Sequence, residues 1–137
     1  MNAQFVKSTL AALAVLTAVW VAPVHAHHSF AAEFDGAKPI TLKGVVTQID
    51  WANPHVWFYI NVKDEEGHTV RWGCEMGAPH QLQQRGWLRE TMKVGDVVTV
   101  AGSLAPDGSK RANARLVTTA DGKTLGAASS GDTTTQQ

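Results

Sequence analysis

Residues Val56–Lys63, with the sequence VWFYINVK, give the clearest indication of the fold. Its residues alternate between an aliphatic or phenyl side chain and a more polar or amphipathic one, which is the pattern of a half-buried β-strand. One face carries Val56, Phe58, Ile60 and Val62, and the other carries Trp57, Tyr59, Asn61 and Lys63. The charged turn 64–67 follows, and the run His68–Met76 can return antiparallel to the first as a hairpin.

Further strands are predicted on both sides of this hairpin. Ile40–Asp50 is rich in β-branched residues, with Gly44 as a bulge or bend, and Val97–Leu104 and Arg111–Thr119 are strand-like as well. A short helix is expected over about Pro79–Arg85, because Pro suits a first helical turn and Gly86 suits the position after the last. The expected core consists of Val56, Phe58, Ile60, Val62, Val70, Trp72, Cys74, Val98, Val100 and Leu116.

The order of these elements predicts the fold class. Five strands with one short helix between the third and the fourth indicate an all-β chain, a small OB-like five-stranded β-barrel. An open β-sandwich of similar length is the alternative, since strand periodicity alone does not separate the two. The position of the helix favours the barrel.

The ends of the chain differ in composition from its middle. Residues 1–26 have the form of a cleavable signal peptide, with Lys7, an apolar core and a predicted cut after Ala26. Residues 27–125 would then form the barrel domain, and the small, polar residues 126–137 a disordered tail. We therefore expect a periplasmic or secreted protein with no transmembrane segment after cleavage, because the apolar core is shorter than a membrane-spanning helix.

Composition and charge exclude several classes of function. The 137 residues include 12 Lys and Arg against 12 Asp and Glu, and this balance does not favour a nucleic-acid partner. A single cysteine rules out an internal disulfide. The sequence shows no established catalytic motif, so no catalytic residue is assigned.

Several motifs resemble a known family. Residues 27–35, HHSFAAEFD, are similar to the start of the mature chain in an uncharacterised family of small secreted bacterial proteins, a domain of unknown function. The segments 51–55 (WANPH), 86–87 (GW), 95–100 (GDVVTV) and 107–109 (DGS) also match its pattern, so the resemblance extends over residues 27 to about 122. It implies export and a small β-barrel, and brings no established activity.

Histidines suggest a copper site. Cleavage after Ala26 would place His27 at the amino terminus, where its amine and imidazole can chelate Cu(II). His28 could substitute or add a ligand, and His55, which follows Asn53-Pro54, is the best candidate for a further one. The alternative is that His27 and His28 belong only to the cleavage region and a frayed chain end.

Two sulfur side chains offer a second metal hypothesis. Cys74 and Met76 share a strand face and could bind Cu(I) together with His55. The same face carries Val70 and Trp72, however, so a plain hydrophobic core explains these residues better.

The non-core face of the hairpin predicts a ligand-binding surface. Trp57 and Tyr59 lie there, beside Arg71 and Glu75 of the next strand, and OB-folds bind ligands on this face. Alternatively, the segment with Phe30 and Phe34 folds back and covers the two rings. We expect an exported binding or accessory module whose partner is a small ligand or a periplasmic protein; the alternative is a structural or protein-interaction barrel without a small-molecule site.

Overall fold

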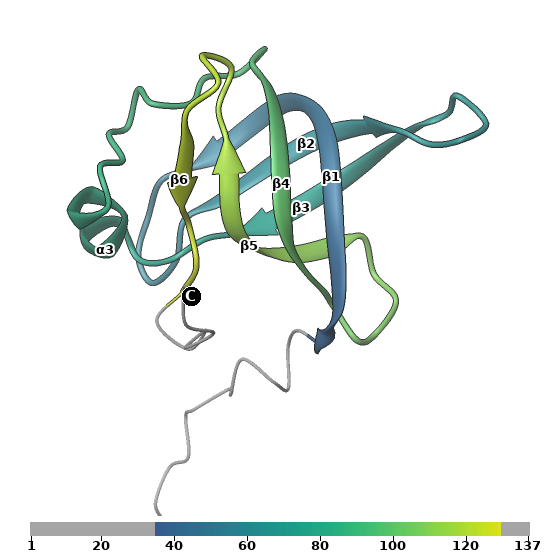
Figure 1. Cartoon of the computed structure of the whole chain (residues 1–137), viewed down its shortest axis with the longest axis horizontal. Coiled ribbons are helices and arrows are strands. Elements are labelled where there is room, and N and C mark those ends of the chain that lie inside the picture. Colours follow the sequence, from purple (N-terminus) through teal and green to yellow (C-terminus); the bar gives the residue numbers. More distant parts are fainter. Residues whose placement is uncertain (1–34, 130–137) are drawn as a thin grey trace, which may run out of the picture.

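The computed structural model describes residues 35–129 as strands, one short helix and connecting turns. Figure 1 shows the strands curving around a common interior, with the helix at one side. The elements in chain order are β1 (Asp35–Asp50), β2 (Trp57–Lys63), β3 (Thr69–Glu75), α3 (Pro79–Gln84), β4 (Val97–Leu104), β5 (Arg111–Thr118) and β6 (Thr124–Gly126).

A ring of five strands organises the fold. The sheet order is β3-β2-β1-β4-β5-β6, and every neighbouring pair is antiparallel. An additional parallel pairing of β3 with β5 joins Gly73 to Arg111 and Glu75 to Asn113, which closes the ring. The predicted class, all-β with one short helix, is confirmed, and five of the strands form a ring. Closure leaves only short unpaired edges, which limits association through open strands.

Most element boundaries agree with the sequence patterns, and the differences lie at the two ends. β4 has the predicted bounds, and α3 covers most of the predicted helix. β1 begins at Asp35, before the predicted start at Ile40. The sixth strand, β6, pairs with β5 and was not predicted. Residues 126–129, assigned to the expected tail, are packed on the ring: Ala127 is fully buried and its backbone N–H donates to Arg115.

β1 pairs with two neighbouring strands and contains a bulge. β1 pairs with β4 through its first part and with β2 through its second, and its register with β2 shifts between Val46 and Gln48. Gly44 was expected to be a bulge or a bend; the bulge lies beyond it, and Gly44 marks a close approach of two strands. A side chain at Gly44 would begin 2.5 Å from the carbonyl oxygen of Asn61.

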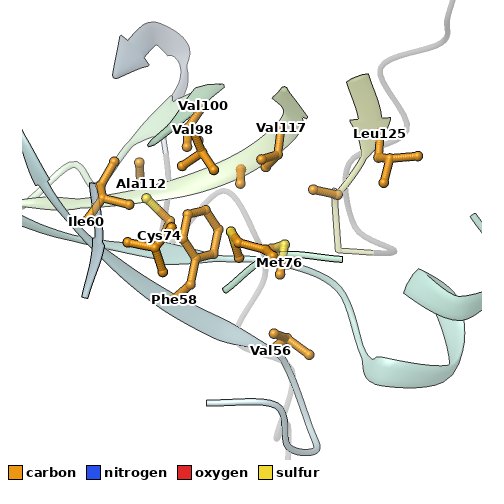
Figure 2. Close-up of a cluster of buried hydrophobic side chains, with 14 of the residues drawn as sticks. Val56, Phe58, Ile60, Cys74, Met76, Val98, Val100, Ala112, Val117 and Leu125 are labelled. Carbon is orange, nitrogen blue, oxygen red and sulfur yellow. The ribbon is translucent and has the colours of Figure 1, made fainter. Parts of the chain in front are cut away.

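The core fills the interior of the ring (Figure 2). Seven of the ten expected core residues are buried, namely Val56, Phe58, Ile60, Trp72, Cys74, Val98 and Val100, while Val62 and Val70 are partly buried at its margin. Leu116 was wrongly placed in the core: it is 41% exposed, and Val117 is buried in its stead. The register between β4 and β5 explains this, because Arg115 is an extra residue on β5 that reverses which side chains point inward.

The region of α3 closes one side of the core. Leu82 of the helix and Trp87 just after it are both fully buried. The indole Nε1–H of Trp87 donates to the carbonyl oxygen of Gly126 at 2.8 Å, which ties this region to the end of β6. Within residues 35–129, the structure contains no helix with the length and apolar character needed to cross a membrane.

Candidate ligand-binding site

A pocket of about 410 Å³ lies on the outer face of β2 and β3, where the β4–β5 loop meets them. We call it the aromatic pocket. It is lined by Asp50, Trp57, Tyr59, Arg71, Gly73, Lys110 and Arg111. In OB-like rings this face, flanked by the loops after the first and fourth strands, is the usual place for ligands. The volume falls in the range of small-molecule sites.

Two aromatic rings form one wall of the pocket. Trp57 and Tyr59 point outward from β2, because Phe58 between them points into the core. Gly73 lies directly opposite Tyr59 on β3. Gly73 is buried, and a methyl group on it would begin 3.3 Å from Tyr59 and 3.6 Å from Trp57, so the lack of a side chain lets both rings lie close to the β3 backbone.

A guanidinium group lies against this aromatic wall and is held in place. The Cζ atom of Arg71 is 4.6 Å from the centre of the Tyr59 ring, a cation–π contact. Arg71 Nη2 donates to Gln48 Oε1 at 2.8 Å. The Nε2 of Gln48 in turn donates to both carboxylate oxygens of Asp50, at 2.9 and 3.0 Å. This chain of contacts fixes the position of Arg71.

The β4–β5 loop supplies the other cationic side of the pocket. Asp107 accepts a hydrogen bond from the backbone N–H of Ser109 at 2.9 Å and one from Arg111 Nη2 at 3.0 Å. The side chain of Ser109, then its backbone N–H, lowers the pKa of Asp107, and Arg111 adds to the effect. Arg111 Nε also donates to Ser109 Oγ at 3.0 Å. These contacts stabilise the turn of the β4–β5 loop.

Lys110 links the loop to β3 and extends toward an aromatic ring. Its carbonyl oxygen accepts from the backbone N–H of Gly73 at 3.0 Å. Its ammonium nitrogen is 5.2 Å from the centre of the Trp72 ring. The pocket therefore combines two aromatic rings with three basic side chains and one acidic side chain.

Of the four predicted ligand-binding residues, three line the pocket and one does not. Trp57, Tyr59 and Arg71 lie together as expected, but Glu75 is not part of the lining. Glu75 is only 5% exposed, and its carboxylate contacts the Nδ1 atom of His55. Strand alternation puts Glu75 on the same face as Arg71, but its pairing with β5 at Asn113 covers this end of β3.

Of the three predicted Cu(II) ligands, His55 is the one that lies within the described residues. His27 and His28 lie outside the described residues. The side chain of His55 is 37% exposed beside Glu75. Among residues 35–129, no group of three or more His, Cys, Asp or Glu side chains comes together as a metal site.

The sulfur pair belongs to the core. Cys74 and Met76 are both fully buried, and Figure 2 shows them beside Phe58. Burial raises the pKa of the Cys74 thiol to about 12. The thiolate that a metal requires is thus strongly disfavoured, and the core interpretation fits both residues.

Four lining residues were missed by the sequence reasoning: Asp50, Gly73, Lys110 and Arg111. Once the hairpin register is known, Gly73 can be recognised as a residue without a side chain that lies beside two aromatic residues of β2. Lys110 and Arg111 come next to the pocket only through the parallel pairing of β3 with β5, which no local pattern reveals.

Comparisons with known proteins place the chain in a family. No curated protein and no solved structure matches it significantly. Residues 14–114 of the 137 match the family described as "Family of unknown function (DUF6152)". This match covers most of the ring, including the aromatic wall of the pocket and both of its loop cations. The chain therefore belongs to the family of unknown function DUF6152.

Proposed function

We propose that this protein is an exported binding module that holds a small, ring-containing molecule in the aromatic pocket. The observation that carries the proposal is the pocket itself, in which the rings of Trp57 and Tyr59 lie together with Arg71. Aromatic side chains bind flat rings and sugar faces by stacking, and held polar groups nearby give orientation. Export is proposed from the signal-like residues 1–26.

The pocket has the features of a preformed site. Arg71 is fixed by Tyr59 and Gln48, and the β4–β5 loop is ordered by Asp107. A ligand would therefore meet side chains already in position, which reduces the entropy lost on binding. A purely structural barrel would not need this arrangement on its outer face.

The test uses the full chain after export and a panel of ring compounds: benzoate, benzamide and methyl glucoside. Binding is followed by the NMR signals of the Gly73 amide and the Trp57 indole. The double substitution Trp57→Ser and Tyr59→Ser should abolish binding. The matched control, Leu88→Ser with Val94→Ser, removes two side chains that are 57% and 65% exposed outside the pocket, and should leave it intact.

Two outcomes contradict the proposal. The first is that no ring compound perturbs the signals of the pocket. The second is that the double variant binds as well as the control variant. Either result would favour the alternative, a structural or protein-interaction barrel without a small-molecule site.

Copper binding through the mature amino terminus is a second candidate, and one contact favours it. The Nδ1 atom of His55 faces the buried carboxylate of Glu75, which leaves Nε2 as the ligand nitrogen. Metal-binding histidines commonly use a carboxylate in this way to fix the ring and raise its basicity. In this proposal the free amine and His27 bind Cu(II) with His55, and His28 substitutes or adds a ligand.

Copper titration of the correctly processed chain tests this candidate. The substitutions His55→Ala and Glu75→Gln should each weaken binding, by at least about tenfold, as loss of a ligand or of its orienting partner does elsewhere. His80→Ala, which changes an exposed histidine on α3, is the control. One extra residue before His27 should also weaken binding, and equal affinity with and without it would rule out the chelate.

A further inference from the structure

We infer that the ligand of the aromatic pocket is an anion, namely a ring or sugar that carries a carboxylate or phosphate group. This inference rests on the proposed function and adds the charge of the ligand to it. It depends on which charged side chains line the pocket and on what each of them contacts.

The lining concentrates positive charge that the chain as a whole does not have. Basic and acidic residues are equal in number over the full sequence, at 12 each. The pocket is lined by Arg71, Lys110 and Arg111 against a single acidic residue, Asp50. A local excess of one charge sign in a concave site attracts small ions of the opposite sign.

Two of the cations that line the pocket, Arg71 and Lys110, contact the faces of aromatic rings rather than carboxylates. Within the described residues, the contacts of Arg71 are the Tyr59 ring and the neutral Gln48 amide. The contact of Lys110 is the Trp72 ring. A guanidinium has five N–H donors in one plane, so a group stacked on a ring can still offer in-plane donors to a carboxylate or phosphate. An ammonium on a ring face likewise keeps its positive charge.

The one acidic residue does not neutralise Arg71. The Gln48 amide lies between the two groups, accepting from Arg71 through its oxygen and donating to Asp50 through its nitrogen. Asp50 is thus satisfied by a neutral donor. Arg111 differs from the other two cations, because it donates to Asp107 and so orders the loop that presents Lys110.

These contacts define the chemistry that the pocket recognises. The ring of the ligand would stack against Trp57 and Tyr59. Its acidic group would be bound by Arg71, and Lys110, whose ammonium lies over the Trp72 ring beside the pocket, would add positive charge. A guanidinium and an ammonium bind carboxylate and phosphate groups alike, so these two groups represent one ligand chemistry with two sources.

The experiment compares probes of the same shape and different charge on the full processed chain. Benzoate should bind at least about tenfold more tightly than the neutral benzamide, and phenyl phosphate tests the second source of the anion. The preference should be large at about 0.01 M ionic strength and nearly absent at about 1 M, where the Debye length falls to about 3 Å. Tighter binding of benzoate or of phenyl phosphate assigns the natural acidic group.

Substitutions separate the charge from the ring. Arg71→Gln and Lys110→Gln should each reduce benzoate affinity severalfold and leave benzamide affinity unchanged. Arg89→Gln removes an exposed arginine that does not line the pocket and should change neither. Two different lining residues are tested, so a folding defect in one variant does not decide the result.

The outcomes distinguish this inference from the proposed function. Benzamide binding as tightly as benzoate, with pocket signals perturbed, would overturn the anion preference and leave the ring site standing. Perturbation of the pocket signals by none of the ring compounds, phenyl phosphate and methyl glucoside included, would overturn both. If the double variant Arg71→Gln with Lys110→Gln kept its preference for anions, the charge of the ligand would be recognised outside this pocket. That result would overturn the inference as well.

Discussion

Gly73 and Tyr59 face each other across the β2–β3 pair, and the missing side chain of the first lets the ring of the second lie close to the β3 backbone. Both residues line the aromatic pocket. In a strand a glycine weakens packing and costs conformational entropy, so a glycine in the middle of β3 needs a local reason. The close packing of two aromatic rings against its backbone is such a reason.

The first prediction concerns this close packing. Gly73→Ala should weaken benzoate binding by about tenfold or more, because the new methyl group would lie 3.3 Å from the Tyr59 ring and displace it. The free energy of unfolding should fall by less than about 3 kcal/mol, the usual upper limit for overpacking. Titration and chemical denaturation measure the two effects.

A second glycine provides the control for this variant. Gly67, in the turn between β2 and β3, has a φ of +84° and open space around its Cα. Gly67→Ala should cost about 1–2 kcal/mol through the left-handed backbone, with unchanged binding. Equal loss of binding in both variants would mean that stability, rather than the packing at Gly73, determines affinity.

The alternation of apolar residues in Val56–Lys63 predicted the inward and outward faces of β2 correctly. The same rule failed on β5, where Arg115 is an extra residue and exchanges the two faces beyond it. A bulge depends on the register of a neighbouring strand, which is a long-range property. Leu116 was therefore assigned to the core when Val117 holds that place.

The second prediction tests the bulge. Val117→Ala should destabilise the protein by about 1 kcal/mol or more, because it removes methyl groups from a side chain with no exposure. Leu116→Ala should change the free energy of unfolding by less than about 0.5 kcal/mol, as is usual for surface positions. Urea denaturation measures both. A larger loss for Leu116→Ala would mean that the strand has the register first expected from sequence.

Only the part of the candidate site that depends on local sequence patterns was predictable. Trp57, Tyr59 and Arg71 follow from alternation and hairpin pairing, which are local. The basic residues at 110–111 join them through a parallel pairing between strands that are far apart in sequence. Glu75 shows the opposite failure: alternation places it on the correct face, but its neighbours β5 and His55 cover it.

The third prediction concerns a close approach of β4 and β5 at Gly102. A Cβ atom on Gly102 would lie 1.9 Å from the carbonyl oxygen of Asn113, a backbone atom that no side-chain rotation can move. Gly102→Ala should therefore cost at least about 3 kcal/mol, at or above the upper range for overpacked cores. Thermal or urea denaturation tests this, with Gly67→Ala as a reference. A cost no greater than that of the reference would show that the strands can separate without penalty.

The fourth prediction concerns the dependence of stability on alkaline pH. Burial raises the pKa of Cys74 to about 12 from an ordinary value of 9.0, so the folded protein keeps the thiol proton after the unfolded chain has lost it. Between these two values the unfolded state binds fewer protons, and stability must fall as pH rises. The expected slope is up to about 1.4 kcal/mol per pH unit, and the contribution is fully present below pH 9.

Urea denaturation at several alkaline pH values measures the slope for the natural protein and for Cys74→Ala. The alanine variant removes the thiol and should show a shallower decline, since only the remaining titrating groups contribute to it. A parallel decline in the two proteins would mean that Cys74 ionises as readily in the folded state as in the unfolded one, and that the core around it admits water.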